Sequence, residues 1–492
     1  MQRTKKRINI LFYGFLIIFL ILAGMLVWRQ AFPDPRLEEA FASQQLEVIK
    51  TVYNRGVFVD RDGRALTGGR IEEEGIAYGD CVTSELLDKV IGEVRVDEDV
   101  TTDEATQGIS GLQAVYDDIL SYRQFPYFIF GVTDAAGNVL KGESVYVKSI
   151  PSVERPVITL TVNANVQRVV EEALADFCVR YPCENIAVVL SDVETGEVLA
   201  MHSVGSYLNT AVISYQPGSV FKLIPLGCAL ENGLISQNTT FDCNGTVTLD
   251  GKEKVVCKDG GHGRQSLEEA VADSCNCAFY EIMRLCNKYD DDGNITGNLV
   301  LEKMRKLGIG THTEPVLNDF VLNYDYAYDF VSDNLFNETA TFNAALGEGD
   351  IQLMPITVNS IVASFANGGK VIEPVIVDNV WRPGEQVEEM ADVEMRTAEL
   401  FNPRVCEIVL SCMRAVCTDG TASLSENVRR EVAGKTGTAE HVDGREDHAW
   451  FAGVFPYDSP QYAMTVMIDE GGSSVNAVQV FDEILARIKP ML

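Results

Sequence analysis

The chain has 492 residues, which is more than one typical domain contains, and 46% of them are hydrophobic. It carries 72 acidic and 40 basic residues, a formal net charge of −32 at pH 7. A chain this acidic is not expected to bind nucleic acid, because the phosphate backbone would repel it. The charge keeps the protein soluble and identifies no specific partner.

An uncharged apolar segment at residues 10–28 lies near the N-terminus and is long enough to cross a bilayer. More basic residues precede it than closely follow it, so the positive-inside rule places the N-terminus in the cytoplasm. No convincing cleavage site follows, which favours a retained signal anchor over a removed signal peptide. The sequence therefore predicts a cytoplasmic tail at 1–7, a single transmembrane anchor at 8–28 and an extracytoplasmic remainder.

Residues 29–150 mix short strand-like runs with charged loops and contain no catalytic motif. They predict a stalk followed by a small pedestal domain that takes no part in catalysis. Between Pro151 and Pro156 the composition turns polar and proline-containing, which marks a domain boundary. A second domain is expected at 155–492.

The second domain begins with a helical pattern at 165–177 and two strands around the hairpin signal Glu194-Thr195-Gly196. Three successive strands at 432–439, 449–455 and 463–468 precede a terminal amphipathic helix at 475–488. Strands at both ends with helices between them predict an α+β fold, in which helices cover an antiparallel sheet beside an all-helical part.

Three short motifs follow one another in this domain: Ser219-Val220-Phe221-Lys222, Ser274-Cys275-Asn276 and Lys435-Thr436-Gly437. Each alone is weak evidence, but S-x-x-K and K-T-G occur once each and in this order. S-x-N also occurs at four other serines. Apolar helical patterns on both sides favour Ser274 among these candidates.

The residue types fit a serine nucleophile with a lysine base. A serine hydroxyl attacks only when a base takes its proton, and residues three apart on a helix share one face, so Lys222 can reach Ser219. Lys222 must be neutral for part of the time, and either burial or a second cation such as Lys435 lowers a lysine pKa. The three motifs therefore predict a site for serine acyl transfer.

The other motifs predict the walls of the site. Ser274 and Asn276 offer hydrogen bonds on the side opposite the nucleophile. The K-T-G segment is expected to be a strand in which Gly437 lets a substrate backbone lie close. The hydroxyls of Thr436 and Thr438 and the ammonium of Lys435 suit a substrate carboxylate.

This motif set is shared by penicillin-binding proteins and class A β-lactamases. Beyond the motifs, the chain resembles the class B penicillin-binding proteins, the peptidoglycan D,D-transpeptidases, over nearly its whole length. Segments similar to the family in place and order are 55–63, 108–117, Leu160-Thr161, Pro217-Gly218, His262-Gly263, Gly420-Thr421-Ala422 and His448-Ala449-Trp450-Phe451. The resemblance implies a β-lactamase/transpeptidase-like fold for the second domain.

The resemblance also implies a role for each motif residue. Ser219 matches the acylated nucleophile, Lys222 its base and Ser274 the proton shuttle to the leaving amine. Asn276 matches a ligand of the substrate amide, and the carboxylate wall corresponds to Lys435, Thr436, Gly437 and Thr438. The backbone N–H groups of Ser219 and Thr438 match an oxyanion hole. One departure is Pro225, which falls inside the expected nucleophile helix and predicts a kink there.

The family's reaction is the cross-linking of stem peptides ending in D-Ala-D-Ala, inhibited by β-lactams and needing no cofactor. Because about 120 residues between anchor and boundary are too few for a glycosyltransferase domain, the resemblance implies a separate membrane glycosyltransferase as partner. Two alternatives stay open: a membrane-anchored serine β-lactamase and a β-lactam sensor. The missing deacylating glutamate counts against the first, and the short cytoplasmic tail counts against the second.

Cys243 and Cys257 flank a predicted hairpin turn almost symmetrically, and their spacing leaves open whether they form a disulfide. Cys275 and Cys277 are interpreted as packing residues, because the sequence offers no activating base. The histidines lack H-E-x-x-H and the cysteines lack paired C-x-x-C spacing, so the sequence predicts no metal site. His262 and His448 are interpreted as structural.

Overall fold

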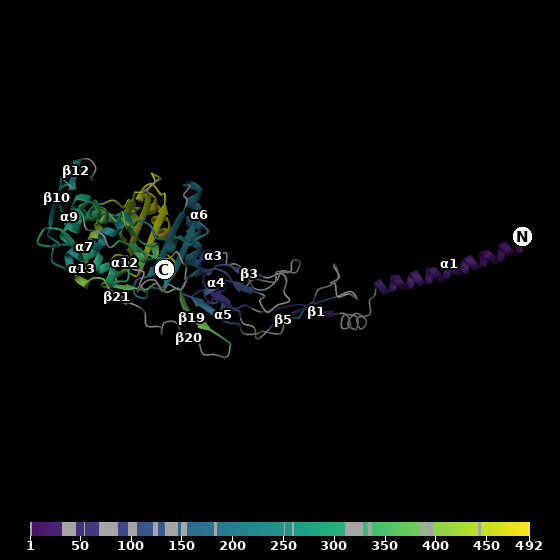
Figure 1. The fold of residues 1–492 in the computed structure, drawn as a ribbon. Coiled ribbons are helices and arrows are strands. Elements are labelled where there is room, and N and C mark those ends of the chain that lie inside the picture. Colours follow the sequence, from purple (N-terminus) through teal and green to yellow (C-terminus); the bar gives the residue numbers. More distant parts are fainter. Residues whose placement is uncertain are drawn as a thin grey trace. The chain divides into compact units, whose positions relative to one another are not determined.

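The computed structural model describes residues 2–31, 46–53, 55–67, 87–96, 106–121, 126–132, 146–148, 155–181, 185–249, 251–257, 260–309, 328–332, 337–383, 388–389, 397–440 and 444–492. The chain divides into two compact units (Figure 1). The first comprises Met1–Asn54, Asp97–Ala105 and Arg123–Val153. The second comprises Arg55–Val96, Thr106–Tyr122 and Glu154–Leu492.

The first unit contains the helix α1 (Gln2–Ala31) and a three-stranded antiparallel sheet. Within α1 the window Leu11–Trp28 has a mean hydropathy of 2.5 and is wholly unburied. Among the described residues, α1 is the one helix that is long and apolar enough to cross a membrane, as the sequence predicted. The sheet has the order β1 (Leu46–Tyr53), β5 (Pro126–Val132), β6 (Tyr146–Lys148).

The second unit contains the five-stranded antiparallel sheet that the sequence predicted from strands at both ends of the domain. Its order is β22 (Ala433–Ala439), β23 (His448–Phe455), β24 (Tyr462–Asp469), β8 (Asn185–Asp192), β9 (Val198–Val204). Strands β23 and β24 are buried almost throughout, so both faces of the sheet are covered and their side chains do not alternate between core and solvent.

Helices cover the two faces of this sheet. On one face, Phe451 of β23 meets Phe481 of α15 (Ser474–Ile488) with ring centroids 4.7 Å apart, and α6 (Ala164–Arg180) packs beside α15. On the other face, Asn359 of α12 (Pro355–Ser364) hydrogen-bonds to Ser191 and Thr465. The layered α+β fold expected from the sequence is therefore confirmed.

An all-helical part lies beyond the sheet, and Figure 1 shows α7, α9 and α13 grouped together. Its helices are α7 (Leu223–Glu231), α8 (Leu267–Ala272), α9 (Asn276–Leu285), α10 (Leu299–Lys306), α11 (Glu338–Ala345) and α13 (Pro403–Thr418). Several begin with a side-chain cap: Ser266 and Glu269 form a capping box on α8, which fixes where that helix starts.

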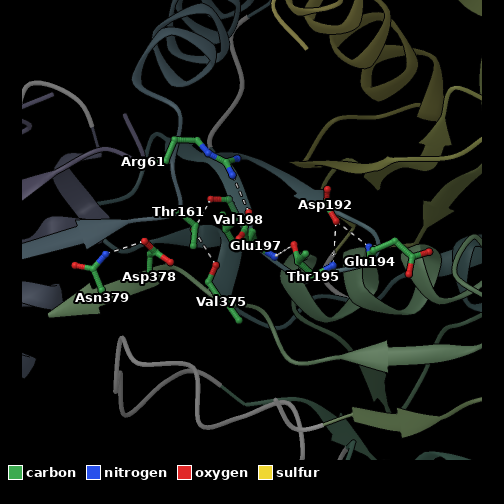
Figure 2. A network of polar contacts seen from close by, with 10 residues as sticks. All are labelled: Arg61, Thr161, Asp192, Glu194, Thr195, Glu197, Val198, Val375, Asp378 and Asn379. Carbon is green, nitrogen blue, oxygen red and sulfur yellow. Dashed lines mark hydrogen bonds and ion pairs between the residues drawn. The ribbon is translucent and has the colours of Figure 1, made fainter. Parts of the chain in front are cut away.

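A second sheet joins the beginning of the second unit to its later part. Its order is β2 (Val57–Val59), β7 (Val157–Leu160), β19 (Val377–Trp381), β20 (Glu388–Glu389), with β2 and β7 parallel. Figure 2 shows how Thr161, just after β7, ties this sheet to the β8–β9 hairpin: its hydroxyl donates to the carbonyl of Val198 at 2.8 Å. Arg61 adds an ion pair with Glu197 at 3.0 Å.

Residues 55–67, 87–96 and 106–121 contribute short elements to the second unit. They are α3 (Asp88–Ile91), β3 (Val94–Val96), β4 (Thr106–Gly108), α4 (Gly111–Val115) and α5 (Asp117–Leu120). Arg55 is almost fully buried and links α4 and α5 through bonds to Gln113 and a 2.7 Å ion pair with Asp117. A buried guanidinium needs hydrogen-bond and charge partners, which accounts for the polar residues Gln113 and Asp117 in α4 and α5.

Small hairpins and short helical segments complete the unit. The pairs are β10 (Thr240–Cys243) with β13 (Gly263–Ser266), β11 (Thr246–Leu249) with β12 (Lys252–Val255), β14 (Asn287–Tyr289) with β15 (Ile295–Asn298), β16 (Phe330–Val331) with β17 (Ile351–Gln352), and β18 (Lys370–Ile372) with β21 (Thr397–Glu399). The short helices are η1 (Thr210–Val212), η2 (Gly218–Lys222) and α14 (Glu426–Arg429).

The structure corrects the prediction for Pro225. The sequence placed this proline inside a helix that already carried Ser219, but the segment Gly218–Lys222 is a 3₁₀ turn and α7 begins only at Leu223. Pro225 therefore lies in the first turn of α7, where a backbone N–H has no helical partner to lose. The change from 3₁₀ to α-helix takes the place of the expected kink.

Candidate active site

The turn that carries Ser219 is held closely against other backbone segments. Gly218 has a φ of +55°, which favours glycine, and its N–H donates to the carbonyl of Gly347 at 3.0 Å. A Cβ added at Gly218 would lie 2.6 Å from the carbonyl oxygen of Thr438. The nucleophile turn therefore packs directly on the edge strand β22, which places Ser219 beside the K-T-G motif.

Gly437 provides the matching space on β22. A Cβ there would lie 2.7 Å from the carbonyl oxygen of Pro217 and 2.9 Å from Val220. The approach of a substrate backbone at Gly437 stays a prediction, and the structure shows in addition that Gly437 lets the turn that carries Ser219 lie close. Trp450 on β23 adds a 2.9 Å hydrogen bond to the carbonyl of Gln216 in the same turn.

Lys222 lies one turn after Ser219 and is fully buried. Its Nζ donates to Asn276 Oδ1 at 2.7 Å, to the carbonyl of Ser274 at 2.8 Å and to Ser274 Oγ at 3.2 Å. The structure thus brings together the first two motifs, which are more than fifty residues apart. Burial lowers the pKa of Lys222 to about 8. A lysine with this pKa has a neutral, proton-accepting fraction at neutral pH.

Ser274 and Asn276 lie in the sharp connection between α8 and α9. Ser274 has a φ of +52°, a left-handed conformation that is uncommon for serine. The N–H groups of Ser274 and Cys275 donate back to the last turn of α8 at 3.1 and 2.9 Å. Asn276 also donates from Nδ2 to the carbonyl of Val256 at 2.7 Å. Its side chain therefore connects Lys222 with the loop after β12.

Lys435 on β22 is also fully buried, and its Nζ donates to the carbonyl of Thr436 at 3.1 Å. Burial, and then the nearby charge of Lys222, hold the pKa of Lys435 well below its usual range. Thr436 shares a 2.6 Å hydrogen bond with Thr421, and Thr438 accepts from the backbone of Ser474 at 3.3 Å. All eight site residues predicted from the sequence therefore belong to η2, the α8–α9 connection or β22.

Comparison with known proteins agrees with this geometry. Residues 186–486 match the family model described as the penicillin binding protein transpeptidase domain. The chain belongs to this family. The match covers more than half of the sequence, so the resemblance noted from the motifs is confirmed.

Individual relatives share only about a quarter of their residues with this chain over the aligned regions. The chain is 27% identical over 384 residues to stage V sporulation protein D of Bacillus subtilis, covering 74% of this chain and 56% of the relative. It is 27% identical over 362 residues to the peptidoglycan D,D-transpeptidase PbpA of Mycolicibacterium smegmatis, covering 65% of this chain and 68% of that one. The chain thus spans little more than half the length of the B. subtilis protein.

Among solved structures, penicillin binding protein 3 of Mycobacterium tuberculosis, in complex with ampicillin, superposes with a TM-score of 0.67 at 18% identity. The superposition covers 90% of this chain and 96% of that one. At this identity the likeness establishes the fold of the transpeptidase family and not the substrate.

Sequence reasoning missed one ionisable residue, Glu348, whose charge interacts with that of Lys222. Glu348 follows Gly347, whose carbonyl accepts from the nucleophile turn. Burial raises the pKa of Glu348 to about 7 and the charge of Glu440 acts in the same direction, whereas Lys222 and Lys254 lower it. The only sequence signal was its position between two glycines, at 347 and 349, which both have positive φ.

His448 was interpreted as structural, and its contacts agree with that interpretation. Its Nδ1 lies 2.9 Å from Asp469 Oδ1, and its ring meets that of Tyr215 edge to face at 5.5 Å. These partners fix the end of β23 against β24.

Proposed function

We propose that this protein is a peptidoglycan D,D-transpeptidase that works through an acyl-enzyme on Ser219. The observation that carries the proposal is the environment of Lys222: a fully buried lysine with a pKa of about 8, one turn from Ser219 and bonded to Ser274 and Asn276. A buried lysine with a lowered pKa, one turn from a serine, supports a role as the base for that serine. The curated relative from M. smegmatis carries the name of the same activity.

In the acylation step, the Ser219 hydroxyl attacks the carbonyl carbon of the penultimate D-alanine while neutral Lys222 takes its proton. The C–O bond forms and the carbonyl oxygen becomes an oxyanion. The backbone N–H groups of Ser219 and Thr438 are proposed to hold this oxyanion, since the two segments touch through Gly218. Collapse breaks the C–N bond, and Lys222 returns the proton to the leaving D-alanine through the Ser274 hydroxyl, 3.2 Å away.

The edge of β22 is proposed to bind the donor peptide. Thr436 and Thr438 supply hydroxyls and Lys435 a charge for the terminal carboxylate, and Asn276 supplies an amide for the substrate backbone. Burial and the charge of Lys222 disfavour the positive charge on Lys435 and so lower its pKa. The carboxylate of an incoming substrate would stabilise this positive charge, which favours binding. A β-lactam, which also carries a carboxylate beside a reactive amide, is expected to bind in the same place and acylate Ser219.

The second half of the reaction distinguishes a transpeptidase from a β-lactamase. An amine of a second stem peptide must attack the acyl-enzyme, whereas a β-lactamase activates water for this step. Glu348 is the acidic residue in a position to be tested as a water-activating base. With a pKa of about 7 it is about half deprotonated at neutral pH, which suits a general base, so Glu348 is the residue on which the β-lactamase alternative has to be tested.

The remaining features of the proposal follow the sequence. Residues 1–7 form the cytoplasmic tail, 8–28 the membrane anchor, 29–150 the stalk and pedestal and 155–492 the extracytoplasmic transpeptidase domain. A membrane glycosyltransferase supplies the glycan strands. Protease added to intact protoplasts is expected to digest everything after the anchor, and a protected C-terminal domain would contradict this orientation.

The proposed activity is tested with the full chain in detergent, in the presence of a polymerase that makes glycan strands from lipid-linked precursors. We expect a cross-linked product and release of D-alanine, both lost in Ser219→Ala, and we expect the penicilloyl adduct to hydrolyse slowly. The variant Glu348→Gln is the matched test of hydrolysis. The opposite result would be an unmodified chain that hydrolyses a β-lactam rapidly and forms no cross-links. If Glu348→Gln abolished that hydrolysis, the proposal of a transpeptidase would give way to a β-lactamase.

A further inference from the structure

Four side chains from separate parts of the sequence meet next to the Ser-x-N motif. They are Cys243 at the end of β10, Cys257 after β12, His262 before β13 and Cys275 at the N-terminus of α9. Their ligand atoms all lie within 4.8 Å of one another. Among the described residues, this is the one such group of three or more histidine, cysteine or acidic side chains. These four residues are called the cysteine cluster below.

We propose that the cysteine cluster binds a zinc ion. Three thiolates and one imidazole are a common ligand set of structural zinc sites, and the ion is held tetrahedrally. At Zn–S distances of about 2.3 Å, tetrahedral ligand atoms lie about 3.8 Å apart, so closing on an ion requires a contraction of about 1 Å at most. Cys243, Cys257 and Cys275 are buried and His262 is exposed, which leaves a path for the ion to enter.

The surrounding backbone is shaped to bring these side chains together. Residues Gly245, Gly260, Gly261 and Gly263 all have positive φ. A Cβ at Gly261 would lie 2.5 Å from the carbonyl oxygen of Cys243, and a Cβ at Gly245 would lie 2.8 Å from the backbone nitrogen of Gly261. The N–H of Cys257 donates to the Gly245 carbonyl at 3.1 Å. Only glycine lets these two loops cross so closely.

The alternative use of these thiols is a disulfide, which the sequence left open for Cys243 and Cys257. In the structure all three cysteines of the cluster are free. A fourth thiol, Cys277, lies 3.8 Å from Cys257 Sγ, but it already donates to the carbonyl of Thr246 at 3.6 Å and is only half-buried. We therefore assign the fourth ligand to His262, and Cys277 provides a matched control.

A metal here would also fix the catalytic segment. Cys275 stands between Ser274 and Asn276, and Asn276 donates to the carbonyl of Val256, which precedes the ligand Cys257. Ser274 is held in its left-handed conformation by backbone bonds to the end of α8 and by the bonds that it accepts from Lys222. An ion on Cys275 would anchor this strained connection to the two hairpins. His262 and the cysteines are thus positioning residues, and zinc binding itself does not depend on the proposed transpeptidase function.

The first test is the metal content of the full chain, purified in detergent from zinc-supplied cells and dialysed against a weak chelator. We expect one zinc ion per chain, retained in Cys277→Ser and reduced at least tenfold in Cys275→Ser and His262→Ala. His262→Cys, which restores a four-ligand set, is expected to retain the ion. Because His262 is exposed, its variants keep the test valid even if Cys275→Ser does not fold.

The second test replaces zinc with Co²⁺, whose thiolate charge-transfer and visible bands report tetrahedral sulfur coordination directly. These bands are expected in the unmodified chain and in His262→Cys, and weakened in His262→Ala. The β-lactam acylation rate should follow the same order. The zinc site would be overturned if the chain held no stoichiometric metal and showed no cobalt bands. A disulfide within the cluster, in protein from its native envelope, would also overturn it. Metal lost in Cys277→Ser but kept in His262→Ala would overturn the assigned ligands.

Discussion

The two walls of the candidate site, β22 on one side of Lys222 and the Ser274-Cys275-Asn276 segment on the other, are held by different means. On one side, β22 is paired along its whole length with β23 in a five-stranded sheet whose faces are both covered by helices. On the other side, the cysteine cluster lies on two two-stranded sheets, β10–β13 and the hairpin β11–β12, and β12 is exposed at every position. Isolated hairpins are marginally stable in water. Packing is therefore sufficient for the first side, whereas the second gains from a cross-link such as a bound metal.

The largest effect is expected from the lysine that connects the two sides. Lys222→Ala should lower the second-order rate of β-lactam acylation by about 10²–10⁴-fold, because Ser219 loses its base. The fold is expected to be retained, although the Ser274 carbonyl and Asn276 Oδ1 lose a donor, and circular dichroism checks this. Lys288→Ala, at an exposed ion pair with Glu302, is the control and should acylate normally. Acylation of Lys222→Ala at nearly the unmodified rate would show that another base operates.

A smaller effect is expected when only the contact between β22 and the turn that carries Ser219 is disturbed. Gly437→Ala places a Cβ 2.7 Å from the Pro217 carbonyl and should cost about 1–3 kcal/mol of stability, with slower acylation as the nucleophile turn moves away. Gly297→Ala is the control, since its Cβ meets nothing closer than 3.5 Å. Denaturant unfolding and acylation rates measure both. Equal behaviour of the two variants would contradict the close contact between η2 and β22.

The pH dependence of acylation should come from Lys222. Its neutral form is the base, so the acylation rate rises with pH through an apparent pKa of about 8 and then levels off. At pH 7 about one molecule in ten has the neutral form and at pH 9 about nine in ten, so the rate should rise about tenfold. A stopped-flow pH profile measures this. A rate that is flat from pH 7 to 9 would exclude Lys222 as the titrating base.

Hydrogen exchange before and after metal removal tests whether the proposed ion supports only the wall that carries the cysteine cluster. A strong chelator should raise amide exchange several-fold in β10–β13 and β11–β12, because the cross-link is lost there. Peptides from β23 and β24 should be unaffected, since their protection comes from the sheet. Exchange that rises equally in both regions would show that the cluster supports the whole domain and not this side alone.

The parts of the fold that a local sequence pattern determines were predictable. Apolar runs gave β23 and β24, the Glu194-Thr195-Gly196 turn gave the β8–β9 hairpin, and the amphipathic pattern gave α15 within one residue at its start. The domain boundaries near 150 stay a prediction. The 3₁₀ turn at Ser219 was missed because its cause is contact with β22 and Gly347, which lie far away in the sequence.

The site was predictable in its motif residues and not in its surroundings. Ser219, Lys222 and Lys435 follow from motif order, since the chemistry fixes both residue type and spacing. The cysteine cluster has no regular spacing, because its four members come from two hairpins and a helix start that only the fold brings together. The close contact between Gly437 and Pro217 was missed for the same reason, since the two residues are remote in sequence.

The most direct test of the central proposal, a serine acyl-enzyme at Ser219, is the intact mass of the full chain after incubation with a penicillin. We expect a single added penicilloyl group, mapped to the peptide containing Ser219 and absent in Ser219→Ala. The exposed serine variant Ser236→Ala, which also removes an S-x-N serine, should label fully. Undiminished labelling of Ser219→Ala, or an adduct that maps to another residue, would contradict the proposed mechanism.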